Sequence, residues 1–118
     1  MNDATPSVLL DRELAAHRRA RAAGDVAVAW RALERAHILS QPKLGPHLRV
    51  HWLMLGYAVR LRDGREILGQ AARLALAPLG ALTGRIPWGN TGRSNVSAFA
   101  EMPVPADLRE QLPGIKRP

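Results

Sequence analysis

The first 85 residues contain four stretches of helical apolar periodicity, bounded by residues that start or stop helices. Thr5, Asp25 and Asp63 are helix-capping residues, and Gly24 is a typical helix stop. No stretch shows the sustained two-residue alternation of a β-strand. We therefore predict an all-α fold. Its four helices are expected at residues 6–23, 25–39, 46–62 and 64–82.

Short connections between these helices predict that successive helices pack as antiparallel hairpins. Ala-Gly-Asp at residues 23–25 and Arg-Asp-Gly at residues 62–64 each precede an Ala/Leu-rich helix, an echo typical of tetratricopeptide hairpins. The chain holds too few such units for a solenoid, so the similarity concerns local packing. Pro78 is expected to kink or end the fourth helix. Residues 1–118 are predicted to form a single domain.

Residues 84–118 lack periodicity and are predicted to form an irregular C-terminal arm rich in Pro and Gly. Apolar residues within the arm indicate that it lies ordered against the helices. Trp88 and Phe99 are expected to be buried there, because two exposed rings would leave a large apolar patch on a monomer. A last helical turn is predicted at 107–111, with fraying at 113–118.

Composition excludes several classes of protein. The absence of cysteine rules out disulfides, thiolate metal sites, iron–sulfur clusters and a cysteine nucleophile. The net charge of +7 would suit a nucleic-acid binder, but the arginines are scattered and the aromatic residues are not interleaved with a basic run. Nucleic-acid binding is therefore not favoured. Without a signal-like start or a long apolar run, we expect a cytoplasmic protein with no membrane association.

The four histidines lie on the inferred interior faces of three helices. His37 falls within the apolar stripe of the second helix, and His47 and His51 are four residues apart on one face of the third. On the first helix, Glu13 and His17 have the same four-residue spacing at the edge of the apolar face. These positions point towards the interior of the bundle.

Hairpin geometry predicts which of these side chains meet. Because the turn lies midway between the second and third helices, residues at equal height have numbers that sum to about 84. His37 with His47, and Glu34 with His51, satisfy this rule, and Glu13 is level with Glu34 across the first hairpin. Since packed helix axes lie about 8–10 Å apart, these side chains can converge on one ion.

Neutral imidazole and carboxylate groups bind divalent transition metals such as zinc, iron, copper or nickel. The single Glu-x-x-His motif is too little for the ligand set of a two-metal carboxylate bundle, so one ion is expected. We predict a cytosolic metal-binding protein that acts as a sensor, buffer or carrier. Its predicted ligands are His37, His47 and His51, with oxygen from Glu34 or Glu13 and with His17 at the periphery.

Two other interpretations stay open. Histidines on apolar faces are commonly core residues, and the helices would then serve as a module that binds a protein partner or a second copy. Alternatively, the chain is a small enzyme with a pocket between the helices and the Asn90-Thr91 arm. That interpretation predicts that Arg85, Asn90 and Thr91 line the same cavity as His37 and His51.

Three stretches of the chain carry a resemblance to a known family. They are residues 30–41 (WRALERAHILSQ), residues 47–55, and residues 86–99 (IPWGNTGRSNVSAF) with the Met-Pro that follows at 102–103. In these stretches the chain resembles a family of small bacterial proteins known only as a domain of unknown function. A histidine-containing helical hairpin and a Pro-x-Gly-Asn-Thr-Gly arm mark it. The family carries no established activity or cofactor, so the resemblance implies no function.

Overall fold

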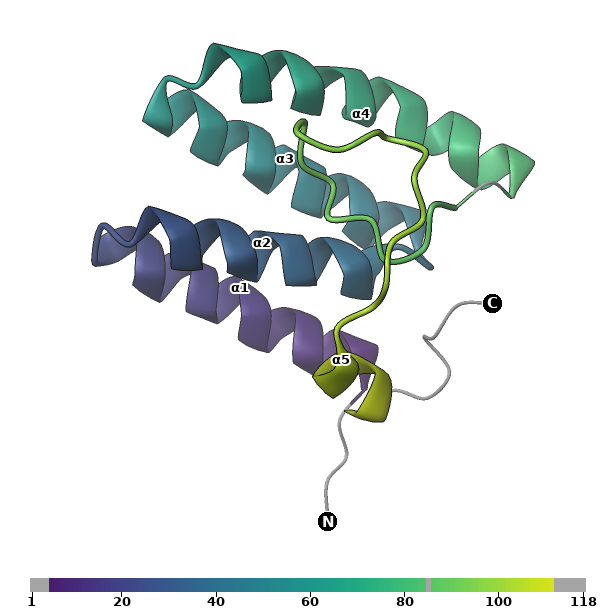
Figure 1. Ribbon diagram of the computed structural model, residues 1–118, viewed down its shortest axis with the longest axis horizontal. Helices are drawn as coiled ribbons and strands as arrows, with labels where there is room; N and C mark the ends of the chain where they lie inside the picture. The colour runs from purple at the N-terminus through teal and green to yellow at the C-terminus, as the bar shows by residue number, and fades with distance from the viewer. Residues whose placement is uncertain (1–4, 85, 112–118) are drawn as a thin grey trace.

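A computed structural model describes residues 5–84 and 86–111, and this part of the chain holds five helices and no strand (Figure 1). The helices are α1 (Pro6–Ala22), α2 (Val26–Ser40), α3 (Leu44–Leu61), α4 (Gly64–Thr83) and α5 (Ala106–Gln111). The predicted all-α class is confirmed. None of the described helices is long and apolar enough to cross a membrane.

Side-chain caps begin three of the four long helices. The side chains of Thr5, Asp25 and Asp63 each accept a hydrogen bond from the backbone N–H three residues later, as their positions predict. Helix α3 lacks such a cap and starts two residues before the predicted position. It does so because the N–H of His47 already bonds to the carbonyl of Lys43, which closes the first turn.

Helices α1 and α2 pack as one hairpin and α3 and α4 as a second, with α2 against α3 between them (Figure 1). This antiparallel arrangement confirms the expected packing. Helix α4 continues through Pro78 to Thr83, so the proline does not end it.

The core lies where the two hairpins meet. Leu33 and Met54 are fully buried there, and each such side chain contributes about 1.5–3 kcal/mol through apolar burial. The buried cluster comprises Leu10, Leu14, Ala20, Ala29, Trp30, Leu33, Ala36, Val50, Met54, Tyr57 and Ala58. Helix α4 adds little to it, because its buried residues are the polar Glu66 and Gln70.

The C-terminal arm runs over the second hairpin and ends in α5 beside the first (Figure 1). Val104 and Leu108 join a second apolar cluster with residues of α1 and α2. Arg35 of α2 forms ion pairs with both α1 and α5. Its Nε lies 2.9 Å from a carboxylate oxygen of Glu13, and its Nη2 lies 2.6 Å from one of Asp107. The predicted last helical turn corresponds to α5, whereas the fraying expected at 113–118 falls outside the described residues.

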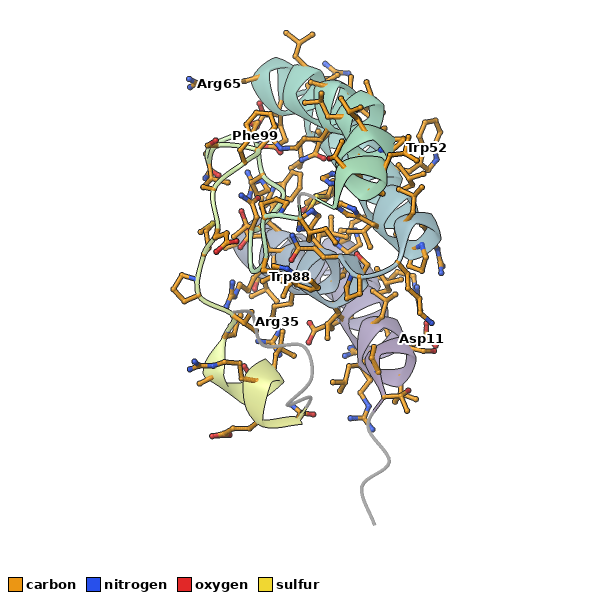
Figure 2. All side chains as sticks on the ribbon, turned by 90° about the vertical axis from the view of Figure 1, so that its right-hand side faces the viewer. Asp11, Arg35, Trp52, Arg65, Trp88 and Phe99 are labelled. Atoms are coloured by element: carbon orange, nitrogen blue, oxygen red, sulfur yellow. The ribbon has the colours of Figure 1, made fainter. Side chains whose placement is uncertain are left out.

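The two aromatic residues of the arm differ from the prediction. Trp88 is half-buried, but Phe99 is 77% exposed and lies on the outer surface in Figure 2. The backbone explains this difference, because the side-chain amide of Asn90 donates to the carbonyls of Ser97 and Ala100. These bonds turn the polar backbone of the tip inwards, and the Phe99 ring projects outwards. The expectation of a buried Phe99 was wrong.

Candidate metal centre

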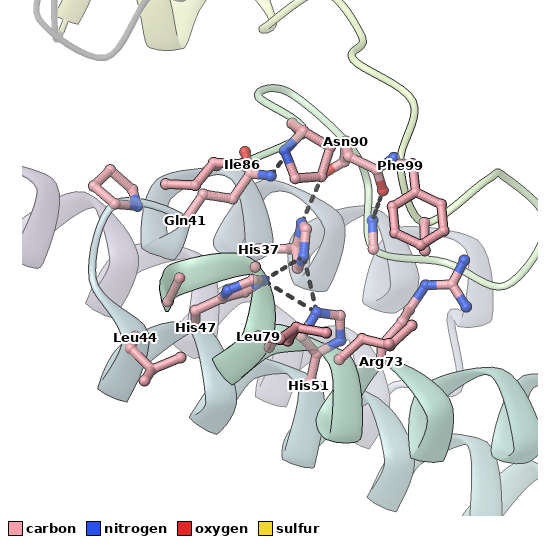
Figure 3. A pocket seen from close by; sticks show the side chains of 18 of the residues that line it. His37, Gln41, Leu44, His47, His51, Arg73, Leu79, Ile86, Asn90 and Phe99 are labelled. Atoms are coloured by element: carbon pink, nitrogen blue, oxygen red, sulfur yellow. Dashed lines mark hydrogen bonds between the residues drawn. The ribbon is translucent and has the colours of Figure 1, made fainter. Parts of the chain in front are cut away.

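Three histidines from two helices bring their Nε2 atoms together (Figure 3). His37 comes from α2, and His47 and His51 come from successive turns of α3. The Nε2 atoms of His37 and His51 lie 3.0 Å apart, those of His37 and His47 3.0 Å, and those of His47 and His51 3.1 Å. His37 and His51 are buried and His47 is half-buried. The expected convergence of these side chains is confirmed, and we call them the three-histidine cluster.

The second ring nitrogen of His37 fixes the tautomer of that ring. Its Nδ1 lies 2.6 Å from the backbone carbonyl oxygen of Asn90. A carbonyl oxygen only accepts hydrogen bonds, so Nδ1 carries the proton and donates it. In the neutral ring, Nε2 of His37 therefore presents a lone pair to the centre of the cluster.

The tautomer of His51 is fixed through Gln70. The Gln70 amide nitrogen donates to Glu66 Oε2 at 2.7 Å and to the carbonyl of Gly92 at 2.8 Å. Its amide oxygen must therefore face His51, whose Nδ1 lies 2.7 Å away and donates. Nε2 of neutral His51 consequently presents a second lone pair to the centre.

These tautomers leave too few N–H protons to form hydrogen bonds between all three Nε2 atoms. The lone pairs of His37 and His51 face one another, and a neutral His47 carries at most one Nε2 proton to share between them. Two acceptors in such contact repel unless something positive lies between them. A cation at the centre would accept all three Nε2 lone pairs at once.

Burial keeps the cluster in the neutral form. Desolvation lowers the pKa of His37 far below its ordinary value, and the neighbouring His51 and His47 rings lower it further. Desolvation and the proximity of His51 lower the pKa of His47 to about 4, and desolvation also lowers the pKa of His51. At neutral pH the three rings are therefore uncharged, the form of histidine that binds metals.

These shifts predict a pH-dependent stability for the metal-free protein. An unfolded chain protonates its histidines near pH 6.5, whereas the folded cluster resists protonation down to about pH 4 at His47. Stability is thus fully present above pH 6.5 and is lost as the pH falls below it, by at most about 1.4 kcal/mol per pH unit for each such histidine. Denaturant unfolding of EDTA-treated protein between pH 7.5 and 5 measures this slope. A flat profile would contradict the neutral, buried cluster.

A buried carboxylate supports the Gln70 amide from behind. Glu66 is 1% exposed and accepts from the backbone N–H and the hydroxyl of Ser94, at 3.0 and 2.8 Å. Arg93 Nε lies 3.0 Å from Glu66 Oε1 and forms an ion pair with it. Burial raises the pKa of Glu66, but hydrogen bonds from Gln70, Ser94 and Arg93 outweigh it and leave the pKa below its ordinary value. The carboxylate therefore stays ionised and holds Gln70 in place.

The arm closes over the cluster at Gly92. This residue has φ +82°, and a Cβ atom added to it would lie 2.6 Å from Cδ2 of His37. The side-chain oxygen of Asn90 accepts from the Gly92 N–H at 2.8 Å, which fixes the turn. The Gly-Asn-Thr-Gly segment thus supplies the acceptor for His37, an acceptor for Gln70, and a glycine where no side chain fits.

The other three predicted ligands lie outside the cluster. Glu34 pairs with Arg93 at 3.2 Å and Arg31 at 3.5 Å, and Glu13 is held by an arginine of α2. His17 lies 3.0 Å from the carbonyl oxygen of Ala29 and packs against a tyrosine ring. Both carboxylates turn to arginines because an ion pair stabilises them at a partly exposed edge. The structure brings neither carboxylate, nor His17, to the three-histidine cluster.

Sequence reasoning missed the residues that orient the rings. Gln70 and Glu66 are four residues apart on one face of α4, a spacing at which side chains of a helix meet. Both are polar on the face that packs inwards, and this was a usable signal. Asn90 and Gly92 gave no comparable signal, because the contacts of an irregular segment have no period.

The cluster forms part of the wall of a cavity of about 370 Å³. Asn90 lines this cavity together with His37 and His51, as the enzyme interpretation predicts. Thr91 is not among its lining residues, and Arg85 falls outside the described residues. The cavity therefore joins the helices to the arm through Asn90.

Fold and site together define a small all-α protein of two helical hairpins with a three-histidine cluster closed by a C-terminal arm. Residues 6–112 match the family described as "Protein of unknown function (DUF3703)", and the chain belongs to this family. The resemblance to a family of unknown function is thereby confirmed. No curated protein and no solved structure matches the chain.

Proposed function

We propose that the protein binds one divalent transition-metal ion through the Nε2 atoms of His37, His47 and His51. The observation that carries this proposal is the meeting of the His37 and His51 lone pairs at 3.0 Å, with the tautomers of both rings fixed by acceptors behind them. In an ordinary core histidine, both ring nitrogens are paired with hydrogen-bonding groups of other residues. Here the Nε2 atoms face one another instead.

The geometry suits a metal ion bound by three imidazoles. A tetrahedral zinc ion with bonds of about 2.0–2.1 Å holds its nitrogens about 3.3 Å apart, so the cluster needs to open by only a few tenths of an ångström. Metal-bound histidines usually donate their other N–H to a carbonyl or carboxylate-linked group, as His37 and His51 do here. An all-imidazole ligand set favours zinc, copper, nickel or iron over calcium and magnesium.

We further propose a cytoplasmic role as a metal buffer or carrier. His47 is half-buried and the cluster lines a cavity, so an ion can reach the nitrogens without unfolding of the bundle. A purely structural ion is normally enclosed by four protein ligands, whereas three leave a position at which an ion can be exchanged. Exchange of this kind is what a buffer or carrier requires.

Thermal and denaturant unfolding of untagged, EDTA-treated protein tests the proposal. Added zinc, nickel or cobalt should stabilise the folded state at pH 7.5, by about 2.7 kcal/mol when the free metal is at 100 times its dissociation constant. The gain should disappear near pH 5, because protons compete for the same nitrogens. If no divalent metal changes the stability, the metal site is wrong and the helical interaction module becomes the better interpretation.

The Gln70 amide is predicted to contribute to metal affinity without touching the metal. Gln70→Leu removes the acceptor for His51 Nδ1 and should weaken metal binding about 10- to 100-fold, the usual effect of losing such a partner. Ser94→Ala is the matched control, because it removes a hydroxyl donor to Glu66 but leaves the Gln70 amide and its bond to His51 in place. Isothermal titration with zinc measures both. Equal losses in the two variants would contradict the role given to Gln70.

A further inference from the structure

The three-histidine cluster opens onto the cavity that lies between α4 and the arm (Figure 3). Three nitrogen ligands leave a tetrahedral ion with one free position. Because all three rings line the cavity, that position faces the cavity and is reached from it. What else lines the cavity then decides what binds there.

The polar side chains of the wall offer no fourth ligand among the described residues. The amide of Gln41 donates to the Pro87 carbonyl and accepts from the Gly89 N–H. Both amide atoms of Asn90 are likewise engaged with the backbone of the arm, and the hydroxyl of Thr83 donates to its own helix. The free position is therefore left to water or to a molecule from solution.

The charge of the wall favours an anion. No Asp or Glu is among the residues that line the cavity, but Arg73 is. Its Nη atoms donate to the carbonyls of Gly69 and Val96, and it forms no ion pair with any carboxylate of the described chain. Glu66, the acidic group whose charge acts on Arg73, is already held by Ser94 and Arg93. Once an ion is bound, the cavity carries a positive charge that no lining residue balances.

The remaining wall is apolar and includes side chains that water reaches. Leu79 of α4 is 58% exposed, and Phe99, whose outward position the backbone of the arm dictates, also lines the cavity. The other large apolar side chains of the wall are Leu44, Leu76 and Ile86. No imidazole outside the cluster and no carboxylate lines it, so the described wall offers no general base for turnover of a bound molecule. The wall therefore suits the binding of a molecule with an apolar part.

We propose that the metal-loaded cavity binds a small carboxylate with an apolar tail. The carboxylate occupies the free metal position, and the tail lies against Leu79 and Phe99. This inference rests on the proposed metal site. The cavity of about 370 Å³ has room for a chain of six carbons.

The test uses the full chain loaded with cobalt(II), whose visible absorption bands respond to each change of ligand. Hexanoate is titrated against acetate, 1-hexanol and hexylammonium at pH 7.5. Hexanoate should change the cobalt spectrum and bind at least tenfold more tightly than acetate, since each buried CH₂ adds a factor of about four. Hexanol and hexylammonium, which have the tail without the negative charge, should leave the spectrum unchanged at the same concentrations.

Two matched leucine variants locate the tail. Leu79→Ser should weaken hexanoate but not acetate, whereas Leu82→Ser should change neither, because Leu82 is 85% exposed on the same helix and does not line the cavity. A cobalt spectrum that ignores hexanoate, equal affinities for hexanoate and acetate, or equal effects of the two variants would overturn this inference alone. Absence of cobalt bands in the unliganded protein would overturn the metal site, and this inference with it.

Discussion

His37→Ala is expected to abolish the stabilisation by divalent metals and to weaken metal binding by more than about 100-fold, beyond the loss caused by removing a residue that only orients a ligand. His37 is the only proposed ligand on α2, and its Nε2 lies 3.0 Å from the Nε2 atoms of both proposed ligands on α3. Without it, only two imidazoles remain, one helical turn apart on α3. Such a pair binds metals weakly. His51→Ala should have the same effect. Isothermal titration with zinc and nickel at pH 7.5 measures the loss.

His17→Ala provides the matched control for both substitutions. This histidine is 4% exposed, bonds to the carbonyl of Ala29 and packs edge-on against Tyr57, so its removal also costs core packing. It lies outside the cluster, and its replacement should lower the stability of the metal-free protein while leaving the metal affinity intact. If the His17 variant loses metal binding as the His37 variant does, the loss reports general destabilisation and the assigned ligands are wrong.

Gly92→Ala is expected to have a large effect, because it changes the arm at the point where the arm contacts His37. The new methyl group would lie 2.6 Å from Cδ2 of His37, closer than real contacts allow. It would also occupy a backbone conformation of φ +82°, which costs a residue with a side chain about 1–2 kcal/mol, with a further 1–3 kcal/mol from overpacking. The arm must move away, and Gln70 then loses the Gly92 carbonyl. Both the stability and the metal affinity should fall.

The control is the same change at Gly56. This residue lies inside α3, and a Cβ atom there would meet nothing within 4 Å. Gly56→Ala should stabilise the protein by roughly 0.5–1 kcal/mol, because alanine favours the helix. Denaturant unfolding gives the two changes opposite signs. A Gly92→Ala protein that matches the parent in stability and zinc affinity would show that the arm does not hold the cluster.

The helices could be predicted from the sequence because their signals are local. Capping by Thr5, Asp25 and Asp63 depends on residues within one turn, and the structure forms all three bonds. The start of α3 was less accessible, since Pro46 favours a helix start but the turn before it closes without a side-chain cap. Local chemistry thus sets the helices, and their exact ends depend on the connections.

Half of the candidate site followed from the same reasoning. In an antiparallel hairpin, residues at equal height have numbers with a constant sum, which places His37 opposite His47. The structure puts their Nε2 atoms 3.0 Å apart. The rule failed for Glu34 and His51, although their heights match, because Glu34 finds Arg93 from the arm. The position of a residue along its helix can be predicted from its residue number. The direction that a charged side chain takes depends on partners distant in the chain.

The orienting residues of the arm were out of reach for the same reason. The carbonyl of Asn90 contacts His37, which is 53 residues away in the sequence. An irregular segment has no periodicity from which such a contact could be predicted. The exposed Phe99 is a further example, because its direction follows from hydrogen bonds between Asn90 and the turn. The arm therefore had to be seen in place before its role at the cluster could be assigned.

X-ray absorption spectroscopy of the untagged protein, loaded with one equivalent of zinc, tests the three-histidine site most directly. The account predicts one ion per chain with three imidazole nitrogens at about 2.0–2.1 Å and a light atom from solvent or solute in the fourth position. The same measurement on His37→Ala should show no such shell. An ion bound by fewer than three imidazoles, or an unchanged shell in the variant, would contradict the site.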